Sequence, residues 1–453
     1  MPDSKDLEGL DALTEIMRNS TPWGEEPLSE EVLAKRRRRR FRRRVGALIT
    51  VVVVLALAGT YASLALTAPI SAASPDAHAP NVTTPAAATI ALPAAGQSAV
   101  SVTGADDYLG TIPDGILAEN GTSAMPMASI SKLITALVIL NAKPLGASGT
   151  GPTLTFDKAD AKLYDKYYVL GATIAAMPAG STMTEHDAIE TMLVVSACNY
   201  AEALTDWAFG SNAAFVHAAK TWMASHGLSD TTMVEPTGID ARNTSTPRDL
   251  IAVGKLALAD PALAAIVAKT HLGDLGIPAL TGMSNTNDLI GTDGINGIKT
   301  GTLDPGGTNL LFSAKVDVGI SAPLTVVGVV LGGGSHSTVD DGAKGIIASL
   351  KAGFHTVQLG KTGQAVGSYS TPWGAKATMV LADSASALTW SNTPITSTMT
   401  MKPLKTGHKG EQVGTVTWVA GTTTVTVPVV LDRTIASPSA WWRLTHPEIL
   451  LSH

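Results

Sequence analysis

A serine and a lysine three residues apart are the residues best placed to do chemistry. Ser129 is followed by Lys132, and no other Ser-x-x-Lys occurs in the chain. Residues three apart share one face of a helix, so the hydroxyl and the amine can meet. The surrounding run is apolar nearly all round, which predicts a buried helix in which a charged lysine costs free energy. An uncharged lysine beside a serine is a general base, so the pair predicts a nucleophile; a lysine snorkelling from the end of a core helix is the alternative.

Two further segments carry clustered polar residues. Lys299-Thr300-Gly301-Thr302 is followed by turn residues at 304–306 and by an apolar strand at 310–314. Other Lys-Thr-Gly triplets begin at Lys361 and Lys405, so context rather than the triplet favours the copy at Lys299. Between the serine and this motif lies Ser196-Ala197-Cys198-Asn199.

Together the three segments resemble the motifs of penicillin-binding D-alanyl-D-alanine carboxypeptidases. Those enzymes carry Ser-x-x-Lys, Ser-x-Asn and Lys-Thr-Gly in this order, and the segment 126–132 is similar to their active-serine segment. The likeness covers about residues 93–445. The second motif departs from the pattern. Cys198 stands at the asparagine position, and Asn199 follows one place late, about 100° further round a helix.

The resemblance implies a role for each motif. Ser129 would be the nucleophile, Lys132 its base, and Ser196 a proton relay to the leaving amine. The substrate-binding residues would be Lys299, Thr300, Gly301 and Thr302. Lys299 would bind the terminal carboxylate, and the backbone N–H groups of Ser129 and Thr302 would form the oxyanion hole. The expected substrate is a peptidoglycan stem peptide and the expected inhibitors are β-lactams, with no metal or cofactor.

Two other functions remain open. A class A β-lactamase shares the motif types, but it adds a Glu-x-x-Leu-Asn loop. Here Glu202 and Glu235 are the only glutamates between Ser196 and Lys299, and neither has Asn four residues on. The second alternative is a catalytically weakened scaffold or peptidoglycan-binding protein, and Cys198 motivates it.

The elements that must position these motifs predict an α+β fold. Strands are expected at 98–102, 309–316 and 324–331, and residues 126–268 are mostly helical. A sheet built from distant segments, flanked by helices, would form the carboxypeptidase domain at 94–356. Alternating Thr and Val at 423–430 predict a smaller β-rich domain at 357–453.

The N-terminal region predicts a membrane anchor. Residues 35–44 are nearly all Lys and Arg, and the apolar run 45–66 would span about 33 Å as a helix. Charge on that flank places the tail 1–44 in the cytoplasm and the remainder outside. A cleaved signal peptide is the alternative, although its apolar region would be shorter. The Ala-, Pro- and Thr-rich segment 67–93 is expected to be an extended linker.

Composition excludes several classes of function. The first 45 residues carry a net charge of +2 and the rest −8, so the ectodomain gives no argument for nucleic-acid binding. One cysteine, Cys198, allows neither an internal disulfide nor a zinc cluster built from cysteines.

Overall fold

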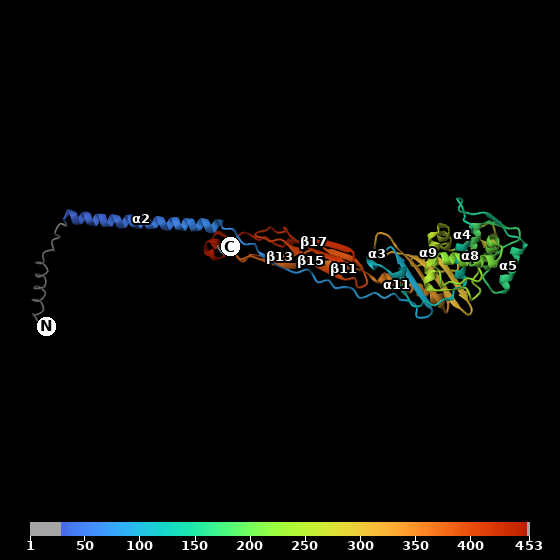
Figure 1. Cartoon of the computed structure of the whole chain (residues 1–453). Helices are drawn as coiled ribbons and strands as arrows, with labels where there is room; N and C mark the ends of the chain where they lie inside the picture. The colour runs from blue at the N-terminus through green and yellow to red at the C-terminus, as the bar shows by residue number, and fades with distance from the viewer. Residues whose placement is uncertain (1–28, 451–453) are drawn as a thin grey trace, which may run out of the picture.

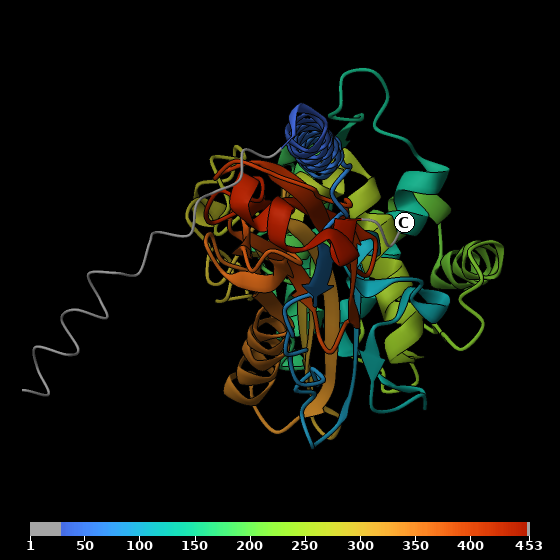
Figure 2. The ribbon, with the colours of Figure 1, turned by 90° about the vertical axis from the view of Figure 1, so that its left-hand side faces the viewer.

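The computed structural model describes residues 29–450, so the predicted tail before residue 29 and the last three residues of the predicted β-rich domain lie outside the described residues. The chain is elongated, and its parts follow one another along one axis (Figure 1). The long helix α2 (Glu30–Thr67) lies at one end, a β-rich domain lies in the middle, and a domain of helices and sheet lies at the other end. A view along this axis shows the parts superimposed (Figure 2).

The outer domain is built on a five-stranded antiparallel sheet with β8 at one edge. Its strand order is β3 (Ala118–Glu119), β2 (Gln97–Thr103), β10 (Leu324–Gly333), β9 (Gly307–Val316) and β8 (Ile295–Leu303). Helix α11 (His336–Ala352) packs on β9 and β10, and α9 (Pro247–Ala259) packs against β2, β9 and β10. The sheet therefore joins strands from both ends of the domain, as the sequence predicted.

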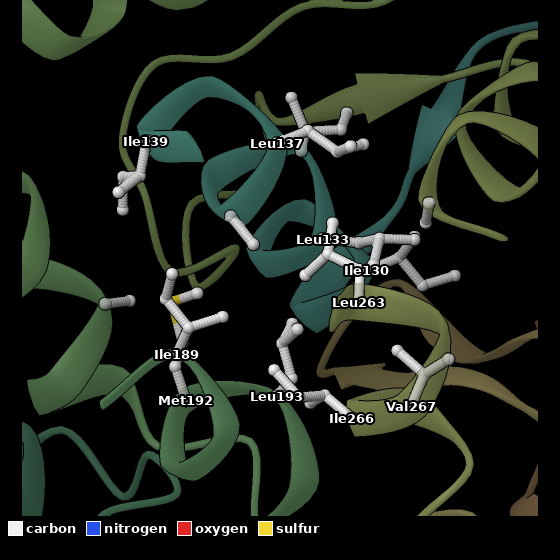
Figure 3. Close-up of a cluster of buried hydrophobic side chains, with 14 of the residues drawn as sticks. Ile130, Leu133, Leu137, Ile139, Ile189, Met192, Leu193, Leu263, Ile266 and Val267 are labelled. Carbon is white, nitrogen blue, oxygen red and sulfur yellow. The ribbon is translucent and has the colours of Figure 1, made fainter. Parts of the chain in front are cut away.

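A helical region separates those strands in the chain. Its helices are α4 (Ser131–Ala142), α5 (Lys158–Val169), α6 (Glu185–Val194), α7 (Cys198–Phe209), α8 (Asn212–Ser225) and α10 (Pro261–Val267). Helix α4 contacts α6, α7, α8 and α9, so it lies at the centre of this region. Figure 3 shows Leu133 of α4 among side chains of neighbouring helices, including Leu193 and Leu263. This packing explains why α4 is apolar nearly all round.

Several short elements complete the outer domain. They are α3 (Asp106–Leu109), η1 (Pro113–Gly115), β4 (Met125–Pro126), η2 (Ala128–Ile130), β5 (Thr153–Thr155), β6 (Thr182–Thr184), β7 (Thr244–Ser245) and η3 (Pro278–Leu280).

The second domain is β-rich. A six-stranded sheet has the order β1 (Ser74–Ala77), β12 (Ala365–Ser370), β13 (Lys376–Leu381), β17 (Thr423–Leu431), β16 (Gln412–Ala420) and β15 (Ile395–Met401). A separate two-stranded antiparallel sheet is formed by β11 (Phe354–Gly360) and β14 (Ala385–Trp390). Trp418 and Tyr369 are fully buried in its core. Two short helices, α12 (Ala440–Thr445) and α13 (Pro447–Leu450), end the described chain. The predicted α+β class with a second, β-rich domain is confirmed.

The segment expected to be a free spacer instead follows the β-rich domain closely. Strand β1 pairs with β12, and Ala73 N–H donates to the carbonyl of Leu404 at 2.6 Å. Further along, Ala88 N–H donates to Ser391 Oγ and Ala91 N–H to Ser349 Oγ, both at 2.9 Å. Backbone groups make these bonds, so a segment can pair with a sheet without an apolar pattern of its own.

We expect Gly328→Ala to destabilise the outer domain. Gly328 lies opposite Phe312 in the sheet, and an added Cβ would lie 2.2 Å from that buried ring. Overpacking of this kind costs about 1–3 kcal/mol. Urea unfolding of the purified chain measures it. Gly273→Ala is the control, because no atom lies within 4 Å of its added Cβ; equal free energies of unfolding for the two variants would contradict the packing.

Candidate active site

The predicted nucleophile and base are in contact. Ser129 lies in η2, the short turn that leads into α4, and Lys132 lies in the first turn of α4. The Nζ of Lys132 donates to Ser129 Oγ at 2.9 Å and to the carbonyl oxygen of Thr237 at 2.7 Å. Lys132 is fully buried, whereas Ser129 is half-buried and thus reachable from the cleft. The alternative of a lysine snorkelling into solvent is therefore wrong.

A turn at residues 235–240 supplies the second acceptor for Lys132. The carboxylate of Glu235 accepts hydrogen bonds from the N–H of Thr237 at 2.7 Å and of Gly238 at 2.6 Å. Gly238 has φ of +84°, and an added Cβ would lie 1.9 Å from the carbonyl oxygen of Ala128. Only glycine fits here, so the turn presses directly on the segment that carries Ser129.

The edge strand β8 brings the third motif against the same segment. An added Cβ on Gly301 would lie 2.9 Å from the carbonyl oxygen of Met127 and 3.0 Å from the nitrogen of Ser129. The glycine therefore lets the backbone of β8 approach the backbone of the serine segment. Thr302 follows with its side chain exposed. This arrangement places the Lys-Thr-Gly-Thr strand directly against the segment that carries Ser129.

Lys299 and Thr300 share one partner. Thr286 Oγ1 accepts from Lys299 Nζ at 3.3 Å and from Thr300 Oγ1 at 2.6 Å. Burial lowers the pKa of Lys299 well below its usual value, and the nearby charge of Lys132 lowers it further, while Cys198 opposes the shift. The three motifs thus lie within electrostatic range of one another. An anion bound beside Lys299 would raise the pKa of its amine again, because an opposite charge favours the protonated form.

The second motif lies at the junction of two helices. Ser196 is buried, with φ of +63°, between the end of α6 and the start of α7. Asn199 is fully buried, and its amide is committed elsewhere: Oδ1 accepts from Ala175 N–H at 3.1 Å and Nδ2 donates to the Ala175 carbonyl at 2.8 Å. Asn199 therefore braces the loop before α6 and does not replace the asparagine that Cys198 displaces.

Sequence patterns did not predict the contacts of three side chains that support the site. Glu235 and Thr286 belong to no motif, and only the folded chain shows their contacts. The third is His336, the first residue of α11, whose Nε2 lies 3.0 Å from Thr302 Oγ1. Its exposure at the end of the active-site strand makes it available to a ligand. A histidine just after a glycine-rich strand end was the one available signal.

A possible cation site lies away from this gap. His186, Asp187 and Glu190 place ligand atoms within 4.8 Å of one another. However, Lys269 Nζ donates to Glu190 Oε2 at 2.6 Å, so a protein cation already contacts this group. The cluster is explained as an ion-pair network.

We expect Glu235→Gln to slow acylation of Ser129 by about tenfold or more. Hydrogen bonds to a charged group contribute about 1.5–3 kcal/mol each, and their weakening would loosen the carbonyl that holds Lys132. The measurement is the rate of reaction with a fluorescent penicillin. Glu202→Gln is the control, because its carboxylate contacts Lys166 and Tyr167 and not this turn. Equal rates in both variants would contradict the supporting role.

Comparison with known proteins agrees with this geometry. Residues 113–333 match the family model described as D-alanyl-D-alanine carboxypeptidase. The chain is 26% identical over 258 residues to D-alanyl-D-alanine carboxypeptidase DacD of Salmonella typhimurium, covering 56% of this chain and 64% of that protein. It is 26% identical over 254 residues to DacA of Escherichia coli, covering 55% of this chain and 60% of that protein. The matches therefore span somewhat less than two thirds of these relatives.

Solved structures share the fold. Penicillin-binding protein 6B of Escherichia coli matches with a TM-score of 0.51 at 21% identity, covering 78% of this chain and 99% of that one. Penicillin-binding protein 5 of Haemophilus influenzae matches with a TM-score of 0.50 at 18% identity, covering 79% and 100%. The region that matches the D-alanyl-D-alanine carboxypeptidase family model, residues 113–333, carries the serine, the lysine and the edge strand of the site.

Proposed function

We propose that the chain is a serine-type D-alanyl-D-alanine carboxypeptidase that removes the terminal D-Ala from peptidoglycan stem pentapeptides. The observation that carries the proposal is the hydrogen bond between a fully buried Lys132 amine and the Ser129 hydroxyl, at 2.9 Å. A lysine amine held in this contact and away from water is placed to take the proton of the serine hydroxyl. The family match supports the same activity.

The reaction is acyl transfer in two steps. Ser129 Oγ attacks the carbonyl of the D-Ala-D-Ala peptide bond while Lys132 takes its proton. The N–H groups of Ser129 and Thr302 stabilise the oxyanion. The bond to the last residue breaks, and its amine takes a proton through Ser196. Water then attacks the acyl-serine ester, which releases the shortened peptide and returns the proton to Ser129.

Substrate binding uses the free edge of β8. An extended peptide can add to this edge by backbone hydrogen bonds, as a further strand. Lys299 and Thr300 would hold the terminal carboxylate, and Thr302 would lie beside the departing residue. We assign His336 to the same carboxylate, because its ring contacts Thr302 Oγ1 at 3.0 Å. The imidazole would offer this carboxylate a further hydrogen-bond donor beside Lys299.

The two alternative functions make different demands on the site. A β-lactamase needs a glutamate that is free to activate the deacylating water. Here Glu235 is bound by backbone N–H groups and Glu202 by Lys166 and Tyr167, so the contacts favour a slowly deacylating carboxypeptidase. A weakened scaffold or peptidoglycan-binding protein remains the second alternative, because Cys198 removes the expected amide from the second motif.

The same proposal includes the position of the chain at the membrane. Helix α2 is long and apolar enough to cross a bilayer. The basic run at residues 35–44 keeps its N-terminal end in the cytoplasm, and the enzyme domain faces outside. We assign residues 45–66 to the membrane, 67–93 to the connecting segment, 94–356 to the enzyme domain, and 357–453 to the β-rich domain.

The test is release of D-Ala from a stem pentapeptide, with penicillin labelling in parallel. The wild-type chain should release D-Ala and form a labelled band, and Ser129→Ala should do neither, because it lacks the nucleophile. Ser123→Ala is the matched control, because this serine is exposed and lies outside the three motifs. Labelling without D-Ala release would favour the β-lactamase or scaffold readings, and no labelling of the wild type would overturn the enzyme proposal.

We expect His336→Ala to raise KM for the pentapeptide by about fivefold with little change in kcat, since an exposed ion pair contributes up to about 1 kcal/mol. His336→Arg should keep the native KM because it restores a cation. A pentapeptide with an amidated C-terminus removes the anion, so all three proteins should process it alike. If His336→Ala changes KM equally for both substrates, the carboxylate is not its partner.

A further inference from the structure

The end of the described chain returns to the helix with which it begins. Helices α12 and α13, within residues 439–450, lie beside the C-terminal end of α2, and α12 contacts α2 directly (Figure 1). On α2, the small side chains of Ala62 and Ala65 face this contact: Ala65 is buried and Ala62 half-buried, whereas most of the helix is exposed. We call residues 439–450 the terminal platform.

A single arginine closes the open end of α2. The last carbonyl groups of a helix have no partner within the helix and carry partial negative charge. Arg443 Nη1 donates to the carbonyl oxygens of Leu66 at 3.2 Å and Ala68 at 2.7 Å, with Ala65 at 3.5 Å. The platform thus supplies the cation that α2 lacks in its own last turn. The guanidinium of Arg443 therefore contacts backbone carbonyl groups of the protein rather than pointing into solvent.

A second contact fixes the position of the platform along the axis of α2. The hydroxyl of Tyr61 donates to the carbonyl oxygen of Leu444 at 2.6 Å. Tyr61 precedes Leu66, the last residue of the apolar run, by five positions, or about 7.5 Å along a helix. Side chains lean toward the N-terminus of their helix, so the Tyr61 hydroxyl does not reach beyond the end of the run. Helix α12 therefore lies at the level of the last turns of the apolar segment.

The other side of the platform is joined to the β-rich domain. The ring of Trp442 meets that of Trp373 edge-on at 6.2 Å and stacks on His446 at 4.8 Å. Leu450 is buried. These contacts hold α12 and α13 in place from the protein side, so the orientation of Trp441, next to Trp442, is defined.

Trp441 is the residue left facing outward. Trp441 is 75% exposed, and Leu64, near the C-terminal end of α2, is 61% exposed. An indole at the end of a membrane-spanning helix matches the aromatic belt at membrane–water interfaces, where an apolar ring and a polar N–H are both satisfied. The exposed part of α12 adds no charge to oppose entry, because its arginine is turned onto α2, and the exposed carboxylate of Glu448 in α13 must stay on the aqueous side.

We propose that the terminal platform lies in the interfacial region of the outer leaflet, with Trp441 inserted among the phospholipid headgroups and upper acyl chains. This inference rests on the proposed membrane anchor and goes beyond it. The protein then holds the bilayer at two points, the spanning helix and the platform, and Arg443 ties them together. The β-rich domain is thereby fixed against the membrane surface rather than suspended from a spacer.

The test places a fluorescent probe at the tryptophan in the full chain. Trp441→Cys is labelled with an environment-sensitive fluorophore and reconstituted into phospholipid nanodiscs, which expose both membrane faces to solvent. Val169→Cys, 83% exposed at the end of α5 in the distal domain, is the matched control. The native Cys198 is buried, and the unsubstituted chain gives the background labelling.

Nitroxide-labelled phospholipid in the disc should quench the probe at 441 and not the probe at 169. Aqueous iodide should show the reverse order, with quenching at 441 several-fold weaker. A probe at 441 that iodide quenches as strongly as at 169, and that nitroxide lipid leaves unchanged, would overturn the platform. Failure of the anchor itself is distinguishable, because the chain would then not co-purify with the discs while D-Ala release in solution persisted.

A second variant separates membrane contact from folding. Arg443→Gln, introduced into the labelled Trp441→Cys chain, removes the cation that holds the platform on α2 and leaves the probe at position 441 in place. Amide exchange of residues 439–450 should become faster and nitroxide quenching at 441 weaker, with D-Ala release from a soluble pentapeptide unchanged. Unaltered quenching in Arg443→Gln would show that the arginine does not position the tryptophan.

Discussion

The site depends on keeping one lysine amine out of water and in contact with one serine hydroxyl. Lys132 is fully buried, yet its two acceptors are a hydroxyl and a backbone carbonyl rather than a carboxylate. These two acceptors hold the amine in place against the serine hydroxyl. Much of the surrounding structure serves this contact. Helix α4 is packed on several sides, and the turn at residues 235–240 carries the second acceptor.

Close backbone approach assembles the site from segments far apart in the chain. Gly238 and Gly301 each lie against the serine segment with no room for a side chain. The buried Lys299 lies near enough to Lys132 for their charges to oppose each other, with burial the larger cause of its lowered pKa. The pair therefore resists carrying two charges until an anion arrives. Under the proposed function this site would receive the terminal carboxylate of the substrate, and the exposed His336 lies against Thr302 at the end of the strand.

The features that could be predicted from the sequence are those that depend on the spacing of residues close together in the chain. Ser129 and Lys132 are three residues apart on one helix, so their contact follows from helix geometry, and the Lys-Thr-Gly strand was identified from its turn and the strand after it. Contacts between distant loops could not be predicted in this way. Glu235, Thr286 and His336 carry no motif, and their partners become neighbours only when the chain folds. The segment 67–93 was expected to be free because apolar spacing says nothing about backbone pairing at a sheet edge.

Lys132→Arg distinguishes a base from a simple cation at the centre of the site. A guanidinium keeps the positive charge and can donate hydrogen bonds, but it does not give up its proton in a protein. The measurement is the rate at which a fluorescent penicillin acylates Ser129, taken together with thermal unfolding to show that the variant folds. Loss of acylation in a folded Lys132→Arg chain is the predicted result. Acylation of that variant at the native rate would contradict the assignment of Lys132 as the base.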